Sequence, residues 1–225
     1  MQQTRLDEPA EYAKRREELR EAEVELMHHR EKVASLRRQL PPGAPVEDYE
    51  FLEGPRSLAD GDDPVTTVRL SGLFTSPERA LVVQHVMYGK LQTSPCPMCT
   101  MWIDGLNGVV RHIGQNADFV VAAAADPPHL RAHARSRGWG NVRLLSCGDS
   151  TFQYDLCAED EAGNQDSTIS VFMLDADGSP RHFNTCHPRM ADDVPERGID
   201  LLSPVWNLLD LTPHGRGEWY AGLDY

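Results

Sequence analysis

The first regular pattern in the chain is an apolar residue at every seventh position of a highly charged segment. Its members are Tyr12, Leu19, Leu26, Val33 and Leu40. This period predicts one long helix from about Pro9 to Leu40 with a narrow apolar stripe, and the Pro41-Pro42-Gly43 run that follows ends it. The stripe fits packing on the rest of the chain, and it also fits a seam between two such helices in a homodimer.

Beyond this helix, short apolar runs alternate with segments of helical period. Strands are expected at 80–88, 119–123, 142–145, 168–174 and 181–185, and helices at 96–113, 127–137 and 199–211. Segment 150–156 fits neither period. The order predicts parallel βαβ units closed by an antiparallel hairpin, which gives an α/β fold with a mixed sheet flanked by helices.

The segment between the long helix and the first core elements is rich in Pro, Gly and Asp. It indicates a linker with one short strand near 49–52. We therefore divide the chain into an N-terminal helical arm (1–42), a linker (43–69) and an α/β domain (70–225).

Composition narrows the classes of partner. The net charge of −13 disfavours nucleic acid, because phosphates would be repelled. No apolar stretch approaches about 20 residues, so no membrane span is expected. The first thirty residues are charged and lack the apolar core of a secretory signal, which makes the cytoplasm the expected compartment. There the five cysteines are expected to be mostly reduced.

The candidate chemistry lies in Cys96-Pro97-Met98-Cys99, between the 80–88 strand and the next helix. Thiols at i and i+3 of a helix start lie one turn apart and can form and break a disulfide. The free N–H groups and the dipole of the helix N-terminus favour a thiolate at Cys96. Pro97 suits the first helical position. We therefore expect Cys96 to be the nucleophile and Cys99, with the higher pKa, to resolve the mixed disulfide.

Four other residues near this tetrad are candidates for a supporting role. Tyr88 and Thr93 lie on the approach to Cys96, where Thr93 could donate a hydrogen bond to the sulfur. His85, within the preceding strand, could tune a thiolate or carry a proton, although a core histidine has the same pattern. Trp102 falls on the apolar face of the helix and is expected in the core.

The remaining cysteines keep a metal alternative open. Cys147, Cys157, Cys186 and His187 could supply further zinc ligands to the tetrad, but they form no second Cys-x-x-Cys pair. Cys147 and Cys157 could also form a second redox pair, and isolated cysteines are often buried apolar residues. We expect no metal and no cofactor.

The tetrad at a strand–helix junction, the βαβ continuation and the closing hairpin and helix resemble the thioredoxin fold. The whole chain also resembles an uncharacterised bacterial family, a domain of unknown function predicted to be a thioredoxin-like dithiol-disulfide oxidoreductase. The matching stretches are Leu36-Arg37-Arg38-Gln39-Leu40-Pro41, Tyr49-Glu50-Phe51, Gly54-Pro55, Leu73-Phe74, Val83-Gln84-His85-Val86-Met87-Tyr88, Cys96-Pro97-Met98-Cys99, Arg137-Gly138-Trp139, Ser170-Val171-Phe172, Asp177-Gly178, Leu208-Leu209-Asp210-Leu211-Thr212-Pro213 and Gly215-Arg216.

This resemblance implies thiol–disulfide exchange with a disulfide-containing protein or a small thiol as partner. Two departures matter. Thioredoxins place a cis-proline just before the strand that follows the second helix. Here that strand opens Asp166-Ser167-Thr168, with no proline. Thr93-Ser94-Pro95-Cys96 matches the Thr-x-x-Cys of peroxiredoxins, yet the arginine that peroxiredoxins carry before the 168–174 strand is missing. A thiol peroxidase and a non-catalytic binding or dimerisation protein are the alternatives.

Overall fold

A computed structural model describes residues 6–148, 150–193, 197–200 and 203–223. The chain divides into two compact units, residues 1–41 and 42–225. Among the described residues, none of the helices combines the length and the apolar character needed to cross a membrane.

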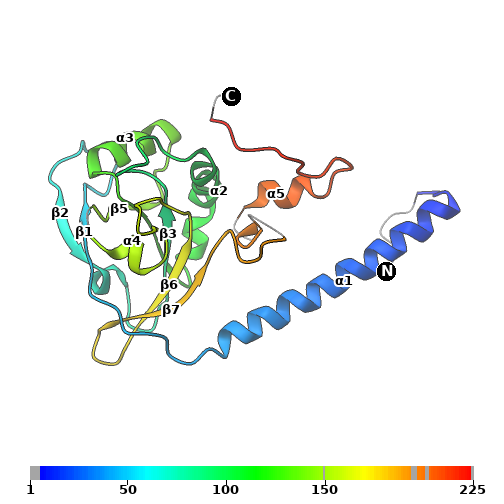
Figure 1. The fold of residues 1–225 in the computed structure, drawn as a ribbon, viewed down its shortest axis with the longest axis horizontal. Coiled ribbons are helices and arrows are strands. Elements are labelled where there is room, and N and C mark those ends of the chain that lie inside the picture. Colours follow the sequence, from blue (N-terminus) through cyan, green and yellow to red (C-terminus); the bar gives the residue numbers. More distant parts are fainter. Residues whose placement is uncertain (1–5, 149, 194–196, 201–202, 224–225) are drawn as a thin grey trace. The chain divides into compact units, whose positions relative to one another are not determined.

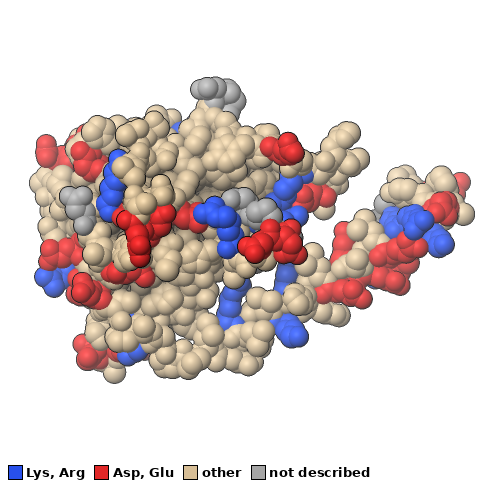
Figure 2. Space-filling view, viewed as in Figure 1, with Lys and Arg blue, Asp and Glu red and all other residues tan. Residues whose placement is uncertain are grey.

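The first unit contains helix α1 (Ala10–Arg38), as the seven-residue period predicts (Figure 1). Pro9 precedes its first turn, and Arg37 and Arg38 lie in its last turn, where positive charge complements the helix dipole. Acidic and basic side chains intermix along the helix (Figure 2), and Arg15 pairs with Glu11 at 3.2 Å. All of α1 is described and none of its residues is buried, so which surface its apolar stripe packs against stays a prediction.

The second unit is built on one seven-stranded sheet in the order β2-β1-β5-β4-β3-β6-β7. Its strands are β1 (Glu50–Glu53), β2 (Thr66–Arg69), β3 (Leu81–Val86), β4 (Asp118–Ala123), β5 (Arg143–Ser146), β6 (Ile169–Leu174) and β7 (Pro180–Cys186). Strands β3, β4 and β5 are parallel, whereas β6, β7, β1 and β2 join as antiparallel neighbours on the two sides. The expected mixed sheet is confirmed.

The helices of this unit are η1 (Leu70–Leu73, 3₁₀), α2 (Pro97–Ile113), α3 (Pro127–Arg137), α4 (Phe152–Asp155) and α5 (Pro204–Leu209). Two of them, α2 and α3, begin at a residue whose side chain caps the first turn. The Asp126 side chain accepts a hydrogen bond from the first turn of α3, and Gly138 ends that helix with φ of 70°. Proline stands at the first position of α2, α3 and α5, where its missing N–H is not needed.

The sheet has a different apolar core on each face, because successive side chains of a strand point to opposite sides. In β4, Phe119 and Val121 belong to the cluster that α2, α3 and α5 cover, which also contains Cys96 and Cys99. Val120 belongs to the second cluster, which η1 and α4 cover. The two thiols therefore belong to the first face alone.

Three segments differ in detail from the expected elements. Residues 43–69 contain not only the short strand β1 but also β2, so the sheet extends into the segment assigned to the linker. The division of the chain at residues 42 and 69 stays a prediction. The ambiguous segment 150–156 contains the short helix α4. The last helix begins at Pro204 instead of 199; residues 201–202 of the expected helix lie outside the described residues.

A substitution at Phe152 tests the packing of the second core cluster. The Phe152 ring is fully buried and lies 4.9 Å from the ring of Phe51 and 6.1 Å from that of Phe172. Phe152→Ala leaves a cavity among these rings and is expected to lower the free energy of unfolding by about 3–5 kcal/mol, measured by urea denaturation. Leu208→Ala, at a 62% exposed side chain, is the control and should change it by less than about 0.5 kcal/mol. Equal urea midpoints for the two variants would contradict this packing.

Candidate active site

Backbone contacts hold the loop between β3 and α2, and with it Cys96, at the carboxyl ends of the parallel strands β3 and β4. The Cys96 N–H donates to the Met87 carbonyl at 3.1 Å, and the Tyr88 carbonyl accepts from the Ala125 N–H at 2.8 Å. Gly89 has φ of 97°, and a Cβ there would lie 2.1 Å from the Ala125 nitrogen. Only glycine fits this close approach, which holds the loop against the end of β4.

Cys96 is the N-cap residue of α2. Its backbone is extended, with φ of −62° and ψ of 125°, and its sulfur accepts a hydrogen bond from the Cys99 N–H at 3.5 Å. The Thr100 hydroxyl donates to the Cys96 carbonyl at 3.0 Å, which fixes the first turn from the other side. A sulfur thus takes the place that Ser or Asp oxygen usually occupies at a helix start, where partial positive charge favours an anion.

The two thiols differ sharply in acidity. The hydrogen bond from the Cys99 thiol lowers the pKa of Cys96 to about 6 despite its burial, with further help from the Cys99 N–H, the Tyr220 hydroxyl and the Met98 N–H. Burial, followed by the neighbouring Cys96, raises the pKa of Cys99 well above its ordinary value. At neutral pH this arrangement favours one thiolate, at Cys96, beside a protonated partner.

A cavity of about 230 Å³ opens next to the thiols. Its lining residues are Met87, Cys96, Met98, Cys99, Trp102, Gln165, Asp166, Ser167, Pro188, Arg189 and Tyr220. Ser167 lies just before β6, in the segment where thioredoxins place a cis-proline; it is buried and donates to the His85 carbonyl at 3.1 Å. Asp166 accepts from the Ser167 N–H and from Arg189, which places an ion pair at the cavity wall.

Two of the four supporting candidates, Trp102 and Tyr88, pack with the core cluster that contains the thiols. Trp102 is buried, lines the cavity and packs edge-on against Trp206 at 5.6 Å. Tyr88 is partly buried beside His133, with ring centroids 6.2 Å apart. Thr93 is exposed, and the hydroxyl that reaches the Cys96 sulfur belongs to Tyr220 instead.

The structure does not bring His85 to the thiols. Its ring stacks on Phe152 at 5.0 Å, in the second core, and its Nε2 lies 3.0 Å from the Ser170 hydroxyl. Complete burial, with a smaller contribution from His187, lowers the pKa of His85 to about 3, so its ring is neutral at physiological pH. It has the environment of a core histidine.

The other cysteines lie in three separate settings. Cys147 is buried, and burial raises its pKa to about 12. Cys157 is exposed, and the Cys186 sulfur accepts from the Asn184 amide at 3.6 Å. Within the described ranges, no three His, Cys, Asp or Glu side chains converge to hold a metal ion, so the zinc alternative gains no support from them.

Sequence reasoning missed the residues that reach the tetrad from far along the chain. Ser167 comes from the loop before β6, Arg189 from the segment after β7, and Tyr220 from the C-terminal segment. These segments have no periodicity that marks a site. The sequence did contain one indication that Asp166 and Ser167 lie near the thiols. They precede a strongly predicted strand, β6, which pairs with β3, the strand that leads to Cys96.

The comparisons agree with this architecture. A family model described as a bacterial protein of unknown function, DUF899, matches residues 1–224. No curated protein matches the sequence of the chain. Among solved structures, a mutant of Xylella fastidiosa PrxQ is similar with a TM-score of 0.50 and 13% identity, covering 73% of this chain and 94% of its own. Reduced 2-Cys peroxiredoxin of Plasmodium vivax has a TM-score of 0.50 and 12% identity, covering 72% and 78%. The thioredoxin-like fold expected from the sequence is confirmed.

The pKa of Cys96 is open to a direct test. In the wild type, its alkylation by iodoacetamide should rise with pH through about 6 and then level off, because only the thiolate reacts. Cys99→Ala removes the donor that contributes most, so the Cys96 pKa should move up towards its ordinary value of 9.0. Cys147→Ala, a change at a buried thiol elsewhere, is the control. Identical pH profiles for Cys99→Ala and wild type would show that the Cys99 thiol does not donate to Cys96.

Proposed function

The chain belongs to this bacterial family, and we propose that it is a thiol–disulfide oxidoreductase with Cys96 as nucleophile and Cys99 as resolving thiol. The observation that carries the proposal is the unequal pair at the start of α2. The Cys96 sulfur accepts from the Cys99 N–H at 3.5 Å and has a pKa of about 6, whereas the pKa of Cys99 is raised. Such a pair suits an exchange that begins with one thiolate and ends in a disulfide.

In the first step the Cys96 thiolate attacks one sulfur of a substrate disulfide. A Cys96–substrate S–S bond forms, the substrate S–S bond breaks, and the second substrate sulfur leaves as a thiolate that takes a proton from water. The low pKa of Cys96 keeps its sulfur ionised at neutral pH. The cavity beside it leaves room for a sulfur and its neighbouring atoms.

In the second step Cys99 loses its proton and attacks the Cys96 sulfur. The Cys96–Cys99 bond forms, the mixed disulfide breaks, and the remaining substrate sulfur leaves as a thiolate. The substrate disulfide gains two electrons and the cysteine pair loses two. Burial still raises the pKa of Cys99 at this stage, but Cys96 in a mixed disulfide is no longer an anion, so its added contribution is gone and deprotonation of Cys99 becomes easier.

The partners of this reaction are a disulfide-containing protein or small disulfide and a thiol reductant that regenerates Cys96 and Cys99. A reducing compartment such as the cytoplasm, the one expected from the sequence, would supply the reductant. A homodimer through α1 remains part of the proposal, because Leu19 and Leu26 on its stripe are 58% and 49% exposed.

Turnover of a model disulfide tests the function. With dithiothreitol as reductant, the wild type should accelerate the reduction of insulin disulfides, and Cys96→Ser should abolish the acceleration. Mixed with insulin in the absence of dithiothreitol, reduced Cys99→Ser should trap a mixed disulfide on Cys96, visible by mass spectrometry as an adduct that later addition of dithiothreitol removes. Cys157→Ser, at an exposed thiol outside the cavity, is the control and should keep full activity. Equal rates for wild type and Cys96→Ser would favour a non-catalytic binding protein.

A thiol peroxidase is the second candidate, and Arg189 favours it. The sequence lacks the expected arginine just before β6, but Arg189 lines the same cavity as Cys96, with its guanidinium paired to Asp166. In this reaction the Cys96 thiolate attacks a peroxide oxygen, the O–O bond breaks, and an alcohol or water leaves. Cys99 then condenses with the Cys96 sulfenic acid to give the disulfide and water.

Hydrogen peroxide and a disulfide separate the two candidates. For the oxidoreductase, dimedone should label Cys96 of Cys99→Ser only slowly at micromolar hydrogen peroxide, while a small disulfide reacts fast. For a peroxidase, the order of the two rates should be reversed, and Arg189→Lys should slow the peroxide reaction more than the disulfide reaction.

A further inference from the structure

We propose that Tyr220 is a catalytic residue of this site, whose hydroxyl donates a hydrogen bond to the Cys96 thiolate from the C-terminal segment. The proposal rests on the proposed function, since it assigns a donor to the nucleophile of that reaction. It adds a residue that lies 124 positions beyond Cys96 and on none of the strands or helices of the fold.

The contact between the two side chains is direct. The Tyr220 oxygen lies 3.6 Å from the Cys96 sulfur, within the range of O–H···S hydrogen bonds. Cys96 is only 3% exposed, whereas Tyr220 is 59% exposed. The tyrosine ring therefore faces solvent while its hydroxyl reaches a buried sulfur. A thiolate has no proton to give, so once Cys96 is ionised the phenol must be the donor.

The other donors to this sulfur belong to the first turn of α2. They are the N–H groups of Met98 and Cys99 and the thiol of Cys99, which is consumed when it resolves the mixed disulfide. Tyr220 is thus the donor that comes from a separate part of the chain. It can stabilise charge on Cys96 at every stage at which that sulfur is anionic, including its release when a reductant opens the Cys96–Cys99 bond.

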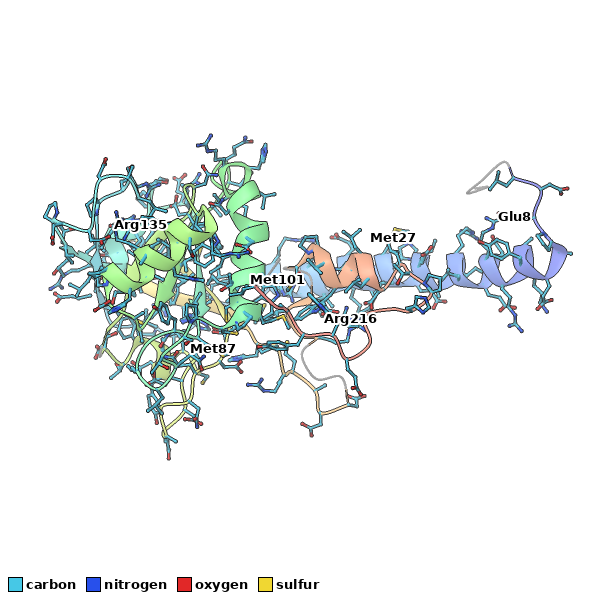
Figure 3. The ribbon with its side chains drawn as sticks, turned by 90° about the horizontal axis from the view of Figure 1, so that it is seen from above. Glu8, Met27, Met87, Met101, Arg135 and Arg216 are labelled. Atoms are coloured by element: carbon cyan, nitrogen blue, oxygen red, sulfur yellow. The ribbon has the colours of Figure 1, made fainter. Side chains whose placement is uncertain are left out.

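Contacts on both sides of Tyr220 hold the C-terminal segment against the rest of the second unit. Before it, Arg216 (labelled in Figure 3) donates to Asp200 at 2.8 and 2.9 Å and lies over the Trp206 ring at 5.2 Å. After it, Ala221 is buried in the same core cluster as Cys96 and Trp206. Two anchors within a few residues restrict the movement of the backbone that carries the phenol, which is what a positioned donor needs.

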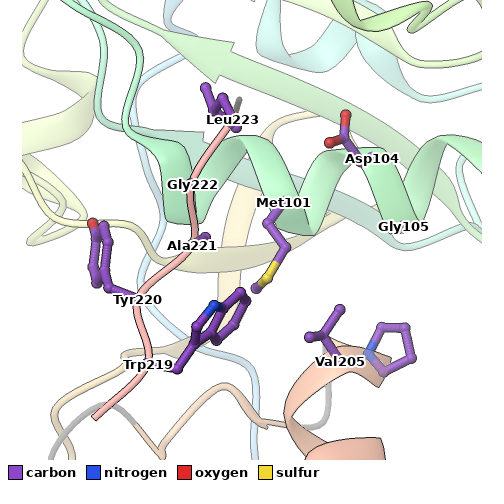
Figure 4. Close-up of a pocket in the computed structure, with 10 residues that line it drawn as sticks. Met101, Asp104, Gly105, Val205, Trp219, Tyr220, Ala221, Gly222 and Leu223 are labelled. Carbon is purple, nitrogen blue, oxygen red and sulfur yellow. The ribbon is translucent and has the colours of Figure 1, made fainter. Parts of the chain in front are cut away.

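The segment also separates two cavities that share Tyr220. One is the thiol cavity of about 230 Å³, and the other is a groove of about 640 Å³ along α2 and the start of α5. In Figure 4 the Trp219 ring points toward Met101 in this groove, while the Tyr220 ring lies on the other side of the chain. The side chains of Trp219 and Tyr220 therefore point in different directions, and the Tyr220 hydroxyl is the group that contacts the Cys96 sulfur.

The other titratable or charged groups around the sulfur are Cys99, whose thiol contributes most to the lowered pKa of Cys96, and the pair Asp166 and Arg189. Cys99 faces Cys96 from α2, and its pKa is raised, so it is neutral at neutral pH. Asp166 and Arg189 line the cavity from the loops, but they form an ion pair with each other at 2.5 Å and oppose one another in charge. Replacing the Tyr220 hydroxyl leaves all three in place.

The test is a titration of thiolate absorbance near 240 nm in the reduced full-length protein. Tyr220→Phe keeps the ring and removes the donor, and it should raise the Cys96 pKa by about one unit, the size expected for one hydrogen bond to a charged group. Tyr154→Phe, at an exposed tyrosine on α4, is the matched control and should leave the titration unchanged.

Alkylation kinetics give a second readout that a structural role would not produce. Tyr220→Phe should react several-fold more slowly than wild type near pH 5.5, where fewer of its Cys96 thiols are ionised. Above pH 8.5 it should react equally fast or faster, because a thiolate of higher pKa is the better nucleophile. A uniform change of rate at all pH values would overturn the proposal.

The outcomes separate this proposal from the proposed function. A lowered pKa in wild type that Tyr220→Phe leaves unchanged overturns the role of Tyr220 and leaves the oxidoreductase intact. An ordinary Cys96 pKa in wild type overturns both. If Tyr220→Phe fails to fold, 3-fluorotyrosine at position 220 replaces it. As the stronger donor, this residue should lower the Cys96 pKa below that of wild type, and no change would contradict the proposal.

Discussion

The sulfur of Cys96 closes the first turn of α2, and this contact joins the fold to the chemistry. In α3 the same place is taken by Asp126, whose carboxylate accepts from the His129 N–H at 3.1 Å. A helix start provides N–H groups that favour an anion whatever the chemical nature of the cap. At α2 the anion is a nucleophile, so a contact that would merely begin a helix also prepares a thiolate.

This arrangement depends on where the sheet places the helix. β3 lies in the middle of the sheet between β4 and β6, and the loop that leaves it is held to the end of β4 through Gly89 and Ala125. Cys99 is consequently pressed against the sheet and fully buried. Burial disfavours its ionised form while the helix start favours ionisation of Cys96, so one geometry moves the two pKa values in opposite directions.

Much of this could be predicted from the sequence because its causes are local. The Cys96–Cys99 spacing, the proline at position 97, the glycine at 138 and the apolar runs of β4 and β6 act within a few residues, and the elements they predict are present. β2 was missed because its Thr66-Thr67-Val68-Arg69 sequence lies on an exposed edge with a weak apolar pattern. Ser167, Arg189 and Tyr220 were missed because loops bring them to the thiols by tertiary packing, which no periodicity records.

The division of the sheet into two cores has a consequence for how this chain can vary over evolution. Substitutions among the side chains around Phe152 and His85 change packing on the face that holds no thiol of the tetrad, so apolar exchanges that conserve volume meet only a stability threshold there. Substitutions on the face of Trp102 and Trp206 must also preserve the surroundings of a reactive sulfur. Relatives with a working site are therefore expected to diverge faster in sequence on the face of Phe152 and His85 than on the face of the thiols. The sheet separates the residues that change fast from those that change slowly.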